Sequence, residues 1–188
     1  MPPSDLDITI CGLHEIVGCF DARTSHAISI LDPDSDEPDG FATLATENLL
    51  RLRFHDVIEP MPTISAPDNG HITAILQFGE AMKAHDAPRL LIHCHAGISR
   101  STATAIILLA HHGATAEAAV ERVVAVRPIA WPNLRMIEIG DRMLKLDQRL
   151  VRAVRRHHAQ ALLRRPELKE AFTRNGRARE VEGLETIS

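Results

Sequence analysis

The stretch that decides the fold reads His93-Cys94-His95-Ala96-Gly97-Ile98-Ser99-Arg100-Ser101-Thr102. It follows a short apolar run, 90–92, and leads into a longer one, 103–110, a pattern that predicts a strand, a tight loop and a helix. Such a loop directs its free backbone N–H groups into one concavity, and the N-terminus of the helix adds partial positive charge. The stretch therefore predicts a binding site for a tetrahedral oxyanion.

The side chains of the loop suit phosphoryl transfer. Arg100 can hold two phosphate oxygens with its guanidinium group, and the positive field of the loop favours the thiolate of Cys94. Gly97 permits the unusual dihedral angles that a wrapped loop requires. We predict that Cys94 is a nucleophile that forms a phosphocysteine. The phosphate would be bound by His95, Ala96, Gly97, Ile98, Ser99 and Arg100.

Two simpler interpretations of the cysteine explain less. Cys94 as a buried small apolar residue does not account for Gly97, Arg100 and Ser101 beside it. A metal site at His93-Cys94-His95 is disfavoured, because neighbouring side chains of an extended chain point to opposite faces. We therefore expect no metal and no other cofactor.

The loop resembles the signature loop of the cysteine-dependent protein tyrosine and dual-specificity phosphatases, which reads His-Cys, five residues, Arg, Ser/Thr. Its Ala-Gly-x-Ser-Arg-Ser ending is most similar to the dual-specificity branch and to small bacterial tyrosine phosphatases. The resemblance implies that the Ser101 hydroxyl hydrogen-bonds the Cys94 sulfur and stabilises the leaving thiolate. A later stretch, 127–133, resembles the Arg-Pro…Pro-Asn segment that buttresses this loop in dual-specificity domains.

The resemblance also implies a general acid, an Asp on the loop between a strand and the long helix before the signature. Asp56 occupies that place, although 94 − 56 = 38 residues is a longer interval than in most relatives. Residues 59–64 look like an insertion, so Glu59 and Asp68 stay open as alternatives.

The rest of the chain alternates strand and helix patterns. Strands are expected at 8–11, 27–31, 49–54 and 89–93, and helices at 13–20, 70–85 and 101–112. Two further helices are expected, one that Thr115 caps and one that begins at Pro132. Alternation of this kind predicts an α/β fold, a three-layer sandwich with a mostly parallel central sheet flanked by helices. The acidic stretch 32–40, with its prolines, is expected to be a solvated surface loop.

Charge divides the chain into two parts. Residues 1–147 carry 11 Lys/Arg and 20 Asp/Glu, a net charge of −9, whereas residues 148–188 carry 10 and 5, a net charge of +5. We predict a phosphatase-like domain at 1–147 and a basic helical tail at 148–188. An apolar stripe over 148–163 favours packing on the body, residues 1–147, or on a partner. The end from Arg174 is expected to be flexible.

The composition indicates where such a protein works. Three cysteines, Cys11, Cys19 and Cys94, form no disulfide framework and suit a reducing compartment, so we expect a cytoplasmic protein. No secretory signal and no membrane span are expected, and no nucleic-acid motif accompanies the basic tail. The oligomeric state stays open.

The sequence thus predicts a phosphatase of phosphotyrosine monoesters, with phosphoserine and phosphothreonine as further substrates, that acts on a phosphorylated protein. A phosphatase of a small phosphometabolite or polyphosphate is the alternative. A non-catalytic phosphoprotein-binding module is a third hypothesis, although such modules usually lack the Cys, the Arg or the acid.

Overall fold

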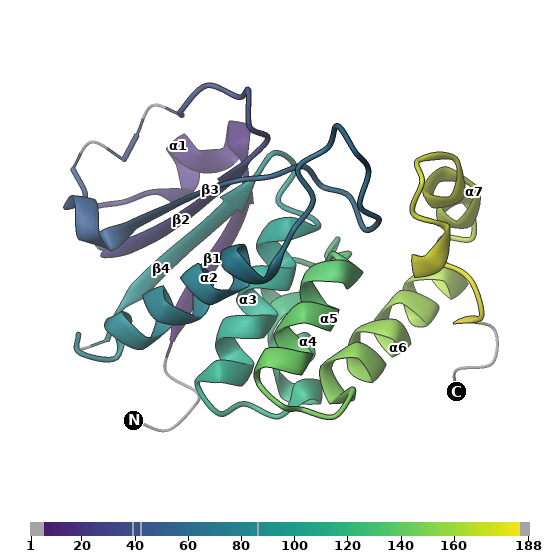
Figure 1. Cartoon of the computed structure of the whole chain (residues 1–188). Coiled ribbons are helices and arrows are strands. Elements are labelled where there is room, and N and C mark those ends of the chain that lie inside the picture. Colours follow the sequence, from purple (N-terminus) through teal and green to yellow (C-terminus); the bar gives the residue numbers. More distant parts are fainter. Residues whose placement is uncertain (1–5, 39, 42, 86, 185–188) are drawn as a thin grey trace.

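A computed structural model of the protein describes residues 6–38, 40–41, 43–85 and 87–184 (Figure 1). The strands are β1 (Asp7–Gly12), β2 (His26–Leu31), β3 (Leu49–Arg53) and β4 (Arg89–Cys94). The helices are α1 (Ile16–Cys19), α2 (Asn69–Met82), α3 (Arg100–His111), α4 (Ala116–Val126), α5 (Leu134–Met143), α6 (Arg149–Arg164) and α7 (Glu167–Arg174). Short 3-10 turns cover Leu13–Glu15, Thr46–Asn48 and Ala178–Glu180.

All four strands run parallel in the order β1-β4-β2-β3. β4 therefore lies inside the sheet, and its last residue, Cys94, pairs with Gly12 at the carboxyl end of β1. Ligands of open α/β sheets bind at the carboxyl ends of such strands, where the strand order reverses. The topology places the signature loop at that position.

The sheet is buried on both faces, as parallel sheets usually are. Alternate side chains such as Ile28 and Ile92 join the main core beneath α2, α3, α4 and α5, whereas Ala27 and Leu91 join a smaller cluster on the other face. That second face is covered by α1 (Figure 1), and Phe41 packs in the same cluster. The predicted α/β fold with helices on both sides is confirmed, with one layer much thinner than the other.

The helix boundaries follow local capping. Thr115 Oγ1 accepts a hydrogen bond from the Ala118 N–H at 3.2 Å and begins α4, as its position predicts. The expectation that Pro132 opens the next helix is wrong by two residues. Asn133 is the cap instead, because its Oδ1 accepts from the Met136 N–H at 3.1 Å, and α5 begins at Leu134.

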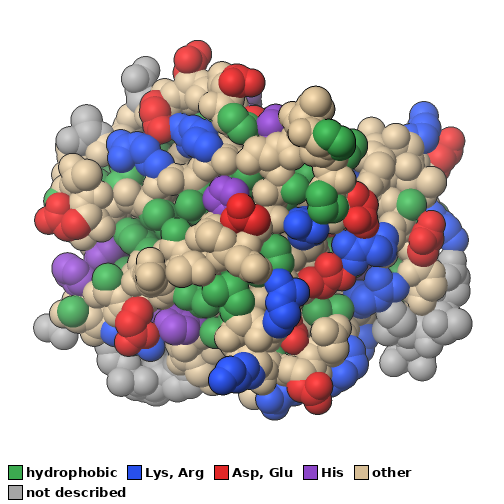
Figure 2. Space-filling view, in the orientation of Figure 1, with side chains coloured by type: hydrophobic (Ala, Val, Ile, Leu, Met, Phe, Trp, Pro, Cys, Tyr) green, Lys and Arg blue, Asp and Glu red, His purple; other side chains and the backbone are tan. Residues whose placement is uncertain are grey.

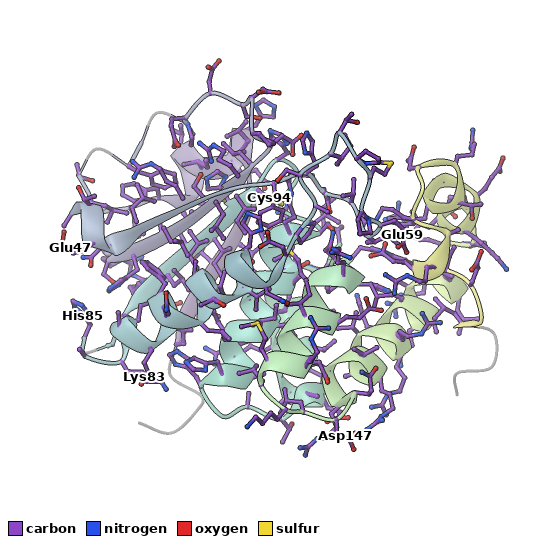
Figure 3. The ribbon with its side chains drawn as sticks, viewed as in Figure 1. Glu47, Glu59, Lys83, His85, Cys94 and Asp147 are labelled. Carbon is purple, nitrogen blue, oxygen red and sulfur yellow. The ribbon has the colours of Figure 1, made fainter. Side chains whose placement is uncertain are left out.

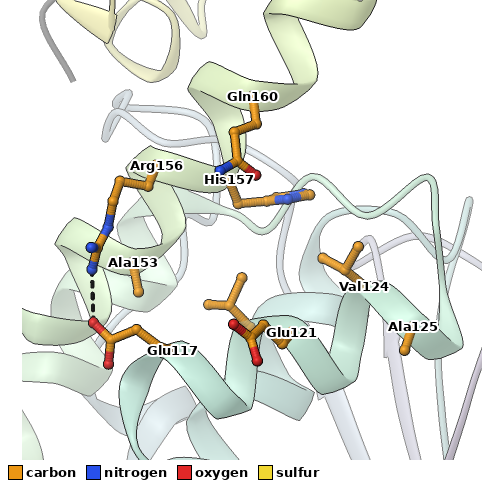
Figure 4. A pocket seen from close by; sticks show the side chains of 9 residues that line it. Glu117, Glu121, Val124, Ala125, Ala153, Arg156, His157 and Gln160 are labelled. Carbon is orange, nitrogen blue, oxygen red and sulfur yellow. Dashed lines mark hydrogen bonds and ion pairs between the residues drawn. The ribbon is translucent and has the colours of Figure 1, made fainter. Parts of the chain in front are cut away.

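The tail helix α6 packs against the body rather than standing free. Its stripe, including Leu150 and Val154, is buried in the main core, and Arg156 pairs with Glu117 of α4 at 2.7 Å (Figure 4). The side chains lining a shallow groove between α4 and α6 are drawn in the same view. A domain boundary at residue 147 stays a prediction.

The expectation of a flexible end from Arg174 is wrong for the described residues up to Leu184. Glu180, Val181 and Leu184 are buried, and the chain after α7 returns toward α6 (Figure 1). Local pattern could not reveal this, because the contacts that hold the segment are to residues far away in the sequence. The last part of the expectation, 185–188, lies outside the described residues. Among the helices that the structure describes, none is long and apolar enough to cross a lipid bilayer.

Candidate active site

The carbonyl groups of the loop between β4 and α3 accept hydrogen bonds from neighbouring segments of the chain. The carbonyl of His95 accepts from the Leu13 N–H at 2.9 Å, and that of Ile98 accepts from the Trp131 N–H at 2.9 Å. Arg127 donates to the carbonyls of both Ala96 and Gly97 at 3.0 Å. This confirms that the Arg-Pro…Pro-Asn stretch braces the loop.

The backbone N–H groups of the same loop stay available to a ligand. Within the described part of the chain, the backbone N–H groups of residues 96–100 donate to no other protein group. Buried or half-buried N–H groups need a partner, and five of them in one turn at the start of a helix form a cradle for an anion. The loop is thus arranged as an anion site before any ligand binds.

Gly97 makes this turn possible. Its φ of +68° lies in the left-handed region, and a Cβ atom at this position would come within 2.4 Å of the Cys11 backbone carbon. The loop therefore packs directly on the end of β1, with no room for a side chain between them.

Cys94 lies at the floor of the cradle, where Figure 3 labels it near the centre of the molecule. Its side chain is almost fully buried, and its Sγ lies 3.3 Å from Ser101 Oγ in the first turn of α3. The preceding residue, His93, faces the other side of the sheet and stacks on Phe41 at 5.5 Å. Burial lowers the pKa of His93 to about 4, so this ring is neutral near pH 7. Cys94 and His93 therefore do not share a ligand.

Arg100 is buried, with 2% of its surface exposed. Its Nη1 donates to Asp32 Oδ1 at 2.7 Å and to the Phe54 carbonyl at 2.5 Å, and its Nη2 lies 3.2 Å from His95 Nδ1. Its Nε is buried and has no hydrogen-bond partner among the described residues. An unpaired buried donor is costly, so this Nε is positioned for an acceptor that the chain itself does not supply.

Asp32 is a site residue that sequence reasoning missed. The stretch 32–40 reads as a solvated loop, yet its first residue leaves β2 beside the cradle and pairs with Arg100. Ser35 of the same loop lies 3.1 Å from His95 Nε2. The position of Asp32 at the carboxyl end of a strand was the one available signal.

Asp56 lies against the signature loop. Its Oδ1 accepts from Ser99 Oγ at 2.7 Å and from Asn133 Nδ2 at 2.8 Å, and it pairs with Arg177 at 3.3 Å. Asn133 also donates to the Val57 carbonyl at 3.2 Å, which fixes the start of this loop.

The two alternative acids have other partners. Glu59 pairs with Arg179 at 2.7 Å on the C-terminal side of the molecule, where Figure 3 labels it. Asp68 caps α2 by accepting from the His71 N–H at 3.0 Å. Of the three candidates, only Asp56 is hydrogen-bonded to the signature loop in the described structure.

No group of three His, Cys, Asp or Glu side chains within the described residues has the arrangement of a metal site. The site comprises the five N–H groups, one thiol, one guanidinium group and the carboxylates of Asp32 and Asp56. This set of groups can bind a phosphate and attack its phosphorus with sulfur.

Comparison with known proteins supports this view of the fold. No protein-family model and no curated protein sequence matches the chain. Human DUSP28 is similar in structure, with a TM-score of 0.55 and 17% identity over 79% of this chain and 95% of that one. A mouse putative dual specificity phosphatase complexed with zinc tungstate has a TM-score of 0.51 and 20% identity over 72% and 77%. The PTP-2 phosphatase of Cydia pomonella has a TM-score of 0.51 and 21% identity over 71% and 83%.

These proteins share with the chain a parallel sheet flanked by helices over most of their lengths. The fold expected from the signature loop is confirmed: the chain has the fold of the cysteine-dependent dual-specificity and protein tyrosine phosphatases.

Proposed function

We propose that the protein is a phosphatase that hydrolyses phosphate monoesters through a phosphocysteine on Cys94. One observation carries the proposal: a loop whose N–H groups 96–100 have no protein acceptor follows a buried thiol, and the Arg100 Nε also lacks a partner among the described residues. A phosphate in the cradle would accept hydrogen bonds from both the loop and Arg100.

In the first step, the Cys94 sulfur attacks phosphorus and the bond between phosphorus and the ester oxygen breaks. Asp56, in its protonated form, gives its proton to the departing oxygen, so the leaving group departs as an alcohol or phenol. The product on the enzyme is a phosphocysteine, and Asp56 is left as a carboxylate.

In the second step, water attacks the phosphocysteine. Asp56 takes one proton from that water, and the bond between phosphorus and sulfur breaks to release inorganic phosphate. The Ser101 hydroxyl, 3.3 Å from the sulfur, donates to the thiolate as it leaves. Both protons are accounted for, and the loop supplies the charge stabilisation that metal ions supply in kinases.

A phosphorylated protein is the substrate class that we favour, with phosphotyrosine first and phosphoserine and phosphothreonine as further residues. The loop between Cys94 and Arg100 contains no Lys, and the Asp32 carboxylate next to Arg100 adds negative charge to the site. Residues 1–147, which carry the site, also have a net charge of −9. Such a site disfavours multiply phosphorylated head groups. The mechanism needs a reduced thiol, so we place the protein in the cytoplasm.

The test is hydrolysis of an aryl phosphate with EDTA present, compared between the natural protein and Cys94→Ser. We expect turnover without added metal, competition by vanadate or tungstate, and loss of turnover to the background rate in Cys94→Ser. Activity that requires a divalent ion, or that survives in Cys94→Ser, would exclude the mechanism. Comparison of kcat/KM for phosphopeptides and for small phosphometabolites then separates the two substrate classes. Phosphopeptide binding without any turnover would instead favour a binding module.

A further inference from the structure

The segment after α7, residues 175–184, returns to the back of the signature loop. Arg177 is 9% exposed there, and its Nη2 donates to Ser99 Oγ at 3.0 Å. Its Nη1 pairs with Asp56 Oδ1 at 3.3 Å. A residue from the C-terminal segment thus touches both the loop and the carboxylate that we assign as the general acid.

The segment is anchored through the only tryptophan of the chain. Trp131 stacks on His158 of α6 at 4.1 Å and on Phe172 of α7 at 4.3 Å, and the Arg177 guanidinium lies 5.2 Å from the centre of the Phe172 ring. The Trp131 backbone N–H is the group that holds the Ile98 carbonyl of the signature loop. The stack therefore connects α6, α7 and the loop in one packed column.

Glu180 neutralises Arg177. It is fully buried, and its two oxygens accept from Arg177 Nε at 2.7 Å and Nη2 at 2.8 Å, from Trp131 Nε1 at 2.9 Å and from the Leu134 N–H at 2.9 Å. Although burial opposes the charged form, Asp56 and Glu180 raise the pKa of Arg177 above its usual value. Because Glu180 balances the charge of Arg177, that charge can be held beside Asp56 without a net excess.

The hydrogen bonds distinguish the two oxygens of Asp56. Oδ1 faces the Ser99 hydroxyl, the Asn133 amide N–H and the Arg177 guanidinium. The last two groups can only donate, and Ser99 Oγ already accepts from Arg177, so its own proton points to Asp56. Oδ2 receives no hydrogen bond from the described residues. A proton on Asp56 therefore belongs on Oδ2.

A second attachment holds the loop that carries Asp56. Arg179 pairs with Glu59 at 2.7 Å, pairs with Glu138 of α5 and approaches the Ile58 carbonyl at 3.4 Å. Figure 2 shows acidic and basic side chains intermixed on the face where this junction lies. The C-terminal segment thus braces the acid loop at both Asp56 and Glu59.

From these contacts we propose that residues 175–184 form part of the catalytic site and that Arg177 is a positioning residue, which fixes Asp56 through Oδ1 so that Oδ2 presents its proton to the leaving oxygen. The inference rests on the proposed function and adds a source of positioning outside the signature loop, namely the C-terminal segment.

The test compares two substrates in each variant: phenyl phosphate, whose leaving group needs a proton, and an aryl phosphate with a strongly acidic phenol, whose leaving group does not. Arg177→Lys keeps the charge but loses the planar fork that reaches Glu180, Ser99 and Asp56 together. We expect it to lower kcat/KM for phenyl phosphate by up to about 10²-fold, the cost of a misplacement of about 1 Å, and to leave the second substrate little changed. Asp56→Ala should show the same selectivity more strongly, by about 10²–10⁴-fold.

The double variant Asp56→Ala/Arg177→Lys separates positioning from general damage. We expect Arg177→Lys to have no further effect on the substrate ratio once Asp56 is absent. Arg174→Lys is the matched control, because Arg174 ends α7 just before this segment, is mostly exposed and, among the described residues, pairs with Glu170 alone. It should leave both substrates unchanged.

If Arg177→Lys does not fold, the pair Arg177→Met with Glu180→Gln removes both charges together and leaves no unpaired buried ion. Equal losses on both substrates, or an additive loss in the double variant, would overturn the positioning role of Arg177. The proposed function would survive that result. It would fail separately if the natural protein did not cleave the acidic aryl phosphate through Cys94.

Discussion

Gly97 allows the signature loop to pack against the end of β1. We predict that Gly97→Ala loses activity on an aryl phosphate by at least about 10²-fold, because the new Cβ would displace the loop from the β1 backbone. Steady-state kcat/KM measures this loss, and a thermal melt checks folding. Gly18→Ala is the control, since a Cβ there meets nothing within 4 Å. Full activity in Gly97→Ala would show that the loop geometry is not needed.

Residues of the site that are close in sequence could be predicted, and distant ones could not. Cys94, Gly97, Arg100 and Ser101 belong to one short motif, so their spacing alone indicated their neighbourhood. Asp32 lies 68 residues from Arg100, and its contact depends on how β2 and β4 pair. Its place at the end of β2 was the one local signal, and the stretch that follows it has the composition of an exposed loop.

Secondary elements with a regular apolar pattern were predicted closely. Apolar and polar residues alternate at 49–54, and the stretch 101–112 is apolar nearly all round, so both patterns indicate buried elements. Both are present, as β3 and α3. The segment 175–184 has no such period. It is held by Arg177, Glu180 and an aromatic stack, and interactions between charged or aromatic groups of distant segments leave no periodic signal.

The stack on Trp131 gives a prediction at the level of elements. Phe172→Ala should reduce the free energy of unfolding by about 2 kcal/mol, because a half-buried ring loses part of the about 1.5–3 kcal/mol of burial and about 0.5–1.5 kcal/mol of stacking. Denaturant melts measure the change. Phe172→Leu keeps most of the apolar area but not the stack, so its free energy of unfolding should lie between those of the natural protein and Phe172→Ala. If Phe172→Ala melts like the natural protein, the segment does not depend on this column.

Across the whole molecule, opposite charges bring the two parts of the chain together. The basic tail places Arg156, Arg177 and Arg179 against carboxylates of the acidic body at Glu117, Asp56 and Glu138. The asymmetry between residues 1–147 and 148–188 was visible in the sequence. The acidic surface that faces these arginines belongs to residues 1–147, and one face of α6 is buried against the same part of the chain.

Buried histidines make the stability of the whole molecule depend on pH. Burial lowers the pKa of His26, His93, His112, His157 and His158, and that of His93 falls from 6.5 to about 4. A group with a lowered pKa in the folded state stabilises the fold fully above its unfolded value. That stabilisation is lost as the pH falls from about 6.5 toward about 4.

We therefore predict that the free energy of unfolding drops as the pH falls from about 6.5 toward about 4, by about 1.4 kcal/mol per pH unit for each proton taken up on unfolding. Denaturant melts at a series of pH values measure the slope. His14→Gln should leave the slope unchanged, because this histidine is exposed. A stability that is flat or rises toward pH 5 would contradict the burial of these rings as neutral groups.

The central claim is that a phosphoryl group is transferred to the sulfur of Cys94. Trapping the phosphocysteine tests this claim most directly. Ser101→Ala removes the hydroxyl that lies 3.3 Å from that sulfur, so it should slow hydrolysis of the phosphocysteine more than its formation. Mixing this variant with an aryl phosphate, quenching rapidly in acid and analysing the peptides by mass spectrometry should reveal one phosphoryl group on Cys94. A burst of phenol equal to the enzyme concentration should accompany it. Phosphate on another residue, or turnover with neither adduct nor burst, would contradict the mechanism.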